Sequence, residues 1–174
     1  SSISQAINYS DVRIQGFEGD VQVSFKQGPT ITSLFGNFSY NKGDVLKGTN
    51  PLTNASIAGT PQDNITPVKI LGGLRLTDKK ERFWGEYSLR YQKEVERVAA
   101  TLEDSPFLIY QDLAGLAGFT IQRLGVGYDW RKDKKSVGLT LNVENLTNKF
   151  YREQFQFAPA RGRSITVGLR IRSM

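Results

Sequence analysis

The chain contains no cysteine and no histidine among its 174 residues. Without cysteine it can form no disulfide and no thiolate metal site, and without histidine it lacks the commonest catalytic acid–base group. The sequence therefore predicts neither an enzyme active site nor a metal centre. It also lacks any apolar run that approaches the roughly 20 residues of a membrane-spanning helix.

Positive charge is in moderate excess, because the chain has 23 Lys and Arg and 17 Asp and Glu, which gives a formal net charge of +6. The basic residues lie in several short clusters, which are usually solvated turns. A nucleic-acid surface would gather them on one face with stacking aromatic side chains. The aromatic residues here are dispersed, so no nucleic-acid partner is expected, and affinity for anionic lipid or phosphate groups stays open.

What the sequence does have is repeated alternation of apolar and polar residues. In "RFWGEYSLRYQKEVE", residues 82–96, Phe83, Tyr87 and Leu89 share one phase while Glu86 and Arg90 share the other. A helix would mix these two sets on every face, so the stretch is predicted to be a strand. Six further stretches alternate in the same way: 17–26, 33–40, 68–77, 123–131, 136–144 and 164–172. About seven strands with little or no helix are predicted.

The connections between these strands alternate in length. Those near 27–29, 78–81 and 132–135 are short and polar, whereas those near 43–64, 97–118 and 149–162 are long. Tight turns at one end and long loops at the other are typical of a membrane β-barrel. A soluble sheet covered on one side remains the alternative.

Aromatic residues gather at the predicted strand ends, as the interface girdles of a membrane barrel require. Near the short turns they are Phe25, Phe83, Tyr128 and Trp130, and near the long loops they are Tyr40, Tyr91, Phe150 and Tyr151.

The C-terminal stretch "LNVENLTNKFYREQFQFAPARGRSITVGLRI" resembles the closing segment of TonB-dependent outer-membrane receptors. That segment typically reads N-L-[T/F]-[N/D]-K-x-Y, then a loop, then P-x-x-G-R-x-[FIV]-x-[VL]-[GS]-[LI]. The matching residues are Asn145, Leu146, Thr147, Asn148, Lys149, Tyr151, Pro159, Gly162, Arg163, Ile165, Val167, Gly168 and Leu169. Upstream, "VRIQGFEGDVQVSF" and "DNITPVKILGGLRL" are similar to earlier strands of the same family. The tail "RIRSM" departs from the family, which usually ends on an aromatic residue.

The resemblance implies an all-β fold, an antiparallel transmembrane β-barrel. Residues 1–174 would supply about seven C-terminal strands of a barrel of about 22, with the plug domain and earlier strands absent. It also implies the outer membrane of a Gram-negative-type bacterium, with the C-terminus in the periplasm. The implied partners are outer-membrane lipid and lipopolysaccharide, the rest of the barrel and its plug, and TonB through the missing N-terminal part.

The implied function is uptake of a scarce nutrient, of the iron–siderophore, haem or cobalamin class, with energy from TonB. The chain itself would be no enzyme, would bind no cofactor, and would contribute wall and loops. A passive porin and a structural or adhesive β-sheet protein are the alternatives.

Candidate site residues follow from the predicted loops. Those expected to meet a ligand are Tyr110, Arg152, Phe155 and Arg161, and those expected to serve the family motif structurally are Asn145, Leu146, Tyr151, Gly162 and Arg163. The carboxylates Glu94, Glu96, Glu103 and Asp104 are expected to be ordinary charges of a wet lumen and its loops, since no EF-hand spacing accompanies them.

Overall fold

The computed structural model describes residues 10–50, 52–62, 65, 68–95, 99, 116–132, 135–153, 156 and 158–173. They form one seven-stranded antiparallel sheet and, among the described residues, no helix. The strands are β1 (Ser10–Gln27), β2 (Thr30–Gly48), β3 (Lys69–Asp78), β4 (Phe83–Gln92), β5 (Phe119–Lys132), β6 (Lys135–Glu144) and β7 (Ser164–Ser173). The all-β antiparallel prediction is confirmed.

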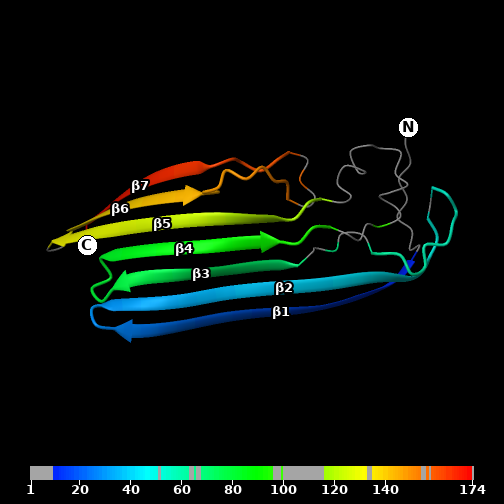
Figure 1. Ribbon diagram of the computed structural model, residues 1–174, viewed down its shortest axis with the longest axis horizontal. Helices are drawn as coiled ribbons and strands as arrows, with labels where there is room; N and C mark the ends of the chain where they lie inside the picture. The colour runs from blue at the N-terminus through cyan, green and yellow to red at the C-terminus, as the bar shows by residue number, and fades with distance from the viewer. Residues whose placement is uncertain are drawn as a thin grey trace.

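The strands follow one another as a meander, each paired with the next in sequence, so β1 and β7 are the two edges. The β1–β2, β3–β4 and β5–β6 turns lie at one end of the sheet, and the longer connections lie at the other (Figure 1). Gly28 opens the first turn with φ +56°, a left-handed conformation that glycine adopts without steric cost.

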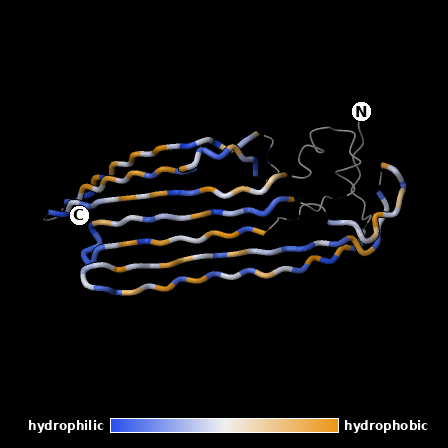
Figure 2. The backbone as a smooth tube through the Cα atoms, in the orientation of Figure 1, coloured by the Kyte–Doolittle hydropathy of each residue, from blue (hydrophilic) through white to orange (hydrophobic). Residues whose placement is uncertain are grey.

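Apolar and polar residues alternate along the strands (Figure 2), and the large apolar side chains of one face are exposed on all seven strands. On β7 it presents Ile165, Val167, Leu169 and Ile171, each 65–73% exposed. The buried apolar residues that the structure describes lie away from this face: Val45, Ile57, Ala99, Leu116, Phe119 and Ile121. An exposed apolar surface of this extent needs a covering. Among the residues that the structure describes, no helix is long and apolar enough to cross a membrane.

Aromatic residues mark both ends of the apolar face. On β1 it begins at Phe17 and ends at Phe25, and on β4 it begins at Phe83 and ends at Tyr91. Each span covers about nine residues, the length with which a tilted strand crosses a bilayer.

The β1–β2 ladder continues past Phe17 and Tyr40, toward Ser10 and Gly48, and in this part the apolar side chains change to the other face. This continuation corrects the predicted start of the first long loop. Val12 and Val45 lie on the otherwise polar face. Arg13 and Asp44, which are opposite each other in the β1–β2 ladder, lie on the otherwise apolar face. Strand β2 therefore continues to Gly48, although the loop was predicted to begin at residue 43.

The end of that loop folds back along β2. The Val45 amide donates to the Thr60 carbonyl at 3.0 Å, and the Gln62 amide donates to the Gly43 carbonyl at 3.0 Å. Strand β4 shows the opposite deviation, because it ends at Gln92 while the alternation predicted a strand to residue 96.

Candidate ligand site and inner wall

The connection from β6 to β7 is held at its base by Asn145. This residue has φ +56° and a side chain only 1% exposed. Its Nδ2 donates to the carbonyls of Lys149 at 2.9 Å and Arg161 at 3.3 Å, and its Oδ1 accepts from the Lys149 amide at 2.8 Å. One buried side chain thus joins the start and the end of the connection.

Asn148 makes the second tie. It also has a positive φ, +52°, and its Oδ1 accepts from the Arg163 amide at 2.8 Å. A Cβ on Gly162 would lie 2.9 Å from the same Oδ1, which explains why glycine precedes Arg163. The Leu146 amide donates to the Gln122 carbonyl at 3.1 Å and fixes the turn to β5. Asn145 and Asn148 therefore join the N-L-T-N-K and G-R elements directly.

Arg90 of β4 anchors the middle of the same connection. Its Nη2 donates to Glu153 Oε1 at 2.8 Å and to the Tyr151 hydroxyl at 3.1 Å. The guanidinium lies 5.3 Å from the ring centroid of Phe119 and 5.8 Å from that of Tyr151, within the range of a cation–π contact. Tyr151 is thus packed over the polar face, which corrects its expected place in an interface girdle.

A hollow of about 300 Å³ opens between the β4–β5 and β6–β7 connections. It is lined by Leu116, Ala117, Gly118, Lys149, Phe150, Tyr151, Arg152 and Pro159. Lys149 and Arg152 supply positive charge, Phe150 and Tyr151 supply rings, and none of these lining residues is acidic. Such a lining suits an anionic ligand with an apolar or aromatic body.

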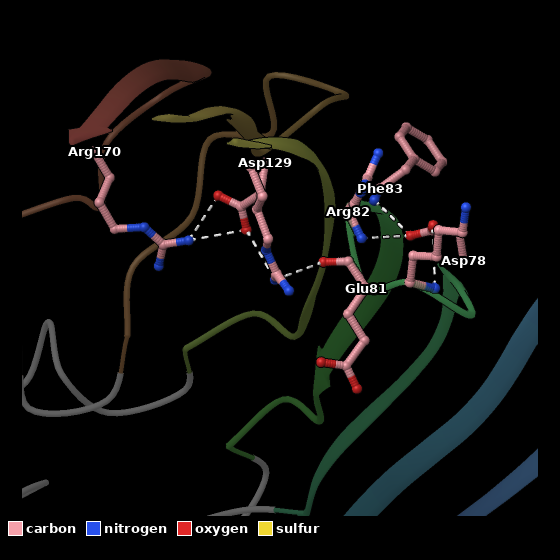
Figure 3. Close-up of polar contacts among 8 residues, drawn as sticks. Asp78, Glu81, Arg82, Phe83, Asp129 and Arg170 are labelled. Atoms are coloured by element: carbon pink, nitrogen blue, oxygen red, sulfur yellow. Dashed lines mark hydrogen bonds and ion pairs between the residues drawn. The ribbon is translucent and has the colours of Figure 1, made fainter. Parts of the chain in front are cut away.

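At the opposite end, Asp129 of β5 and Arg170 of β7 meet across β6. Arg170 Nη2 lies 2.8 and 3.0 Å from the two Asp129 carboxylate oxygens (Figure 3). Gly138 stands between them in the ladder, and a Cβ there would collide with Asp129 Oδ1. Arg131 Nη2 lies 3.9 Å from the same carboxylate and donates to the Glu81 carbonyl at 3.1 Å.

The β3–β4 turn beside this pair is closed by Asp78 (Figure 3). Its Oδ1 accepts from the amides of Phe83 at 2.7 Å and Arg82 at 2.6 Å, and its Oδ2 accepts from Lys80 at 3.3 Å. These hydrogen bonds hold the pKa of Asp78 below its ordinary value, and the bond from the Phe83 amide has the largest effect. Asp78 has the same phase as Leu74 and Leu76 on β3, and Leu76 is the last apolar residue of that phase. Asp78 therefore lies just past the end of the apolar face.

The family model described as "TonB dependent receptor-like, beta-barrel" matches residues 1–146 of the chain. The chain belongs to this family. No curated protein and no solved structure matches it. The match ends at Leu146, so only Asn145 and Leu146 of the C-terminal motif fall within it.

Members of the TonB-dependent receptor family are outer-membrane transporters, not enzymes, and their barrels work with a plug and with TonB. The predicted family and the predicted barrel fold are confirmed. In such a barrel the apolar face contacts lipid and the polar face lines the lumen. Arg90, Asp129 and Arg170 are therefore residues of the inner wall.

Of the predicted ligand residues, Arg152 lines the hollow. Arg161 is exposed and its carbonyl is bound by Asn145. Tyr110 and Phe155 lie outside the described residues, as do Glu96, Glu103 and Asp104, while Glu94 is exposed. No group of three or more acidic side chains that could hold a metal ion occurs in the described part of the chain.

Two charged residues at this end of the sheet, Lys149 and Arg90, were not among the predicted ligand residues. Lys149 was assigned only to the family motif, although its charge beside Arg152 was visible in the sequence. Arg90 was read as one polar-phase residue of a strand, and only its place at the long-connection end of β4 could have indicated a role. Its partner Glu153 is 63 residues away.

Proposed function

We propose that the chain forms part of the wall and the ligand-contacting loops of a transporter that takes up a scarce nutrient of the iron–siderophore, haem or cobalamin class. The hollow at the long-connection end carries this proposal, because two cations and two rings line it without an acidic residue. The two cations favour a ligand with anionic groups, such as an iron chelate or haem, over cobalamin.

The proposal includes the orientation and the remainder of the barrel. Residues 1–174 supply seven of about 22 strands, with the C-terminus in the periplasm and the long connections outside the cell. The apolar face then contacts outer-membrane lipid and lipopolysaccharide, and TonB acts through another part of the receptor.

The test is uptake of labelled iron chelates, haem and cobalamin by cells that carry the whole receptor. Charge-assisted hydrogen bonds contribute about 1.5–3 kcal/mol. The double change Lys149→Gln and Arg152→Gln should therefore raise the half-saturating concentration of the transported ligand at least about tenfold. Arg161→Gln, on the same connection but outside the hollow, is the matched control.

Two results would contradict the proposal. Unchanged half-saturation in the double variant would remove the hollow from ligand binding. Uptake that rises linearly with concentration and persists without TonB would identify a passive porin.

A further inference from the structure

Two cross-strand rows lie side by side on the inner wall near the short turns. One row is Asp129, Gly138 and Arg170, and the other is Arg131, Ser136 and Arg172. In each row the middle residue, on β6, is small, and in the first row the side chains of Asp129 and Arg170 meet over it. The wall is thus shaped to present these charged groups on one surface, which we call the arginine surface (Arg131, Arg170 and Arg172).

The arginine surface carries more positive than negative charge. Three arginines accompany one carboxylate, that of Asp129, which gives 3 − 1 = +2. Asp129 is shared between Arg170 at 2.8 Å and Arg131 at 3.9 Å. Arg172 is exposed, and its side chain makes no hydrogen bond or ion pair with any residue that the structure describes.

This surplus matters because the lumen of a family member holds a plug. Where the plug excludes water from the wall, a guanidinium without a counter-charge is costly. It cannot escape by losing its proton, because arginine stays protonated in proteins. A carboxylate on the opposing surface removes the cost and forms two-pronged hydrogen bonds with the guanidinium.

We propose that the arginine surface docks the plug of the same receptor through a segment that carries aspartate or glutamate side chains. Arg172 is the main contact, since Arg170 and Arg131 already hold Asp129. The Asp129–Arg170 pair fixes the position of the surface. The inference rests on membership of the family and is independent of which ligand is transported.

A zero-length cross-link tests the contact in the whole receptor in outer-membrane vesicles without ligand. Arg172→Lys places an amine on the surface, and a water-soluble carbodiimide joins an amine only to a carboxylate that touches it. Mass spectrometry should find residue 172 joined to an aspartate or glutamate of the plug. The native Lys132 lies on the lipid-facing phase at the same end of the sheet. It is the control and should be joined to no carboxylate of the plug.

The proposal is overturned if residue 172 joins only carboxylates of the barrel, joins nothing, or joins the plug no more often than Lys132 does. A second measurement uses Arg172→Gln, which removes no bond within the described wall. Amide hydrogen exchange of one plug segment should then quicken at least about fivefold, since removing one partner of a charged pair costs about 1 kcal/mol or more. Unchanged exchange with lowered uptake would instead assign Arg172 to the passing ligand.

Discussion

The two faces of this sheet are built on different rules. Within its apolar span the lipid-facing side consists mainly of apolar side chains, and most of its aromatic residues stand at the ends of the strands. On the lumen side, large or charged groups lie over small ones: Phe35 over Gly73, Trp84 over Gly127, and the Asp129–Arg170 pair over Gly138. The first face needs only to be apolar, whereas the second needs particular residues opposite one another.

The largest expected difference between the faces concerns an added charge in mid-strand. Leu141→Arg places a cation on the lipid side and should lower the free energy of unfolding by about 2–4 kcal/mol. Thr140→Arg, one residue earlier, points into the lumen and should cost far less. Urea unfolding of the whole receptor in lipid vesicles measures both. Equal losses would contradict the assignment of the faces.

The assignment of faces is also what the sequence predicted best. Alternation of residue type every second position is a local property, so it located seven strands and the three short turns. The change of face at Gly16 and Phe17 escaped because the alternation was followed only from Phe17 onward. The contacts over Gly73, Gly127 and Gly138 escaped for another reason, since they depend on strand register, which only the pairing of the strands reveals.

The candidate site was less predictable than the faces. The motif residues Asn145, Gly162 and Arg163 were expected to have a structural role, which stays a prediction, and the structure adds the side-chain bonds of Asn145 and Asn148. The ion pair of Arg90 with Glu153 joins residues far apart in sequence, and no local pattern indicates such a pair.

The next largest effect is expected where the lumen side continues into the β6–β7 connection. Asn145→Ala removes three hydrogen bonds and leaves an alanine at φ +56°. Buried groups without partners and a strained backbone should together cost about 2–3 kcal/mol in urea unfolding.

Asn148→Ala is the control for the Asn145 change, because it shares the positive φ but loses one described side-chain bond instead of three. It should cost about 1–2 kcal/mol. A loss equal to that of Asn145→Ala would show that backbone strain, and not the buried amide, dominates.

A smaller effect is expected at two adjacent glycines of β3 that point to opposite sides. A Cβ on Gly73, on the lumen side, would lie within 3 Å of several ring atoms of Phe35, at 2.8 and 2.9 Å for two of them. Gly73→Ala should therefore cost about 1–2 kcal/mol through overpacking. Gly72, on the lipid side, has nothing within 4 Å of the same position, and Gly72→Ala should leave stability within about 0.5 kcal/mol. Urea midpoints of the two variants compare the faces directly.

The smallest effect is expected at the β3–β4 turn, where the apolar face ends. Because the bonds from Phe83 and Arg82 hold the pKa of Asp78 below 3.8 in the folded chain, the ionised carboxylate stabilises the turn above that pH. This contribution is lost as the pH falls through the lowered pKa. Asp78→Asn should thus lower the urea midpoint slightly at pH 7, and the gap to the unchanged receptor should narrow as the pH falls below 3.8 and through the lowered pKa. A gap that keeps its size over the whole acid range in which the receptor stays folded would mean that shape and not charge makes Asp78 the closing residue. The boundary of the lipid-facing side would then depend on turn geometry alone.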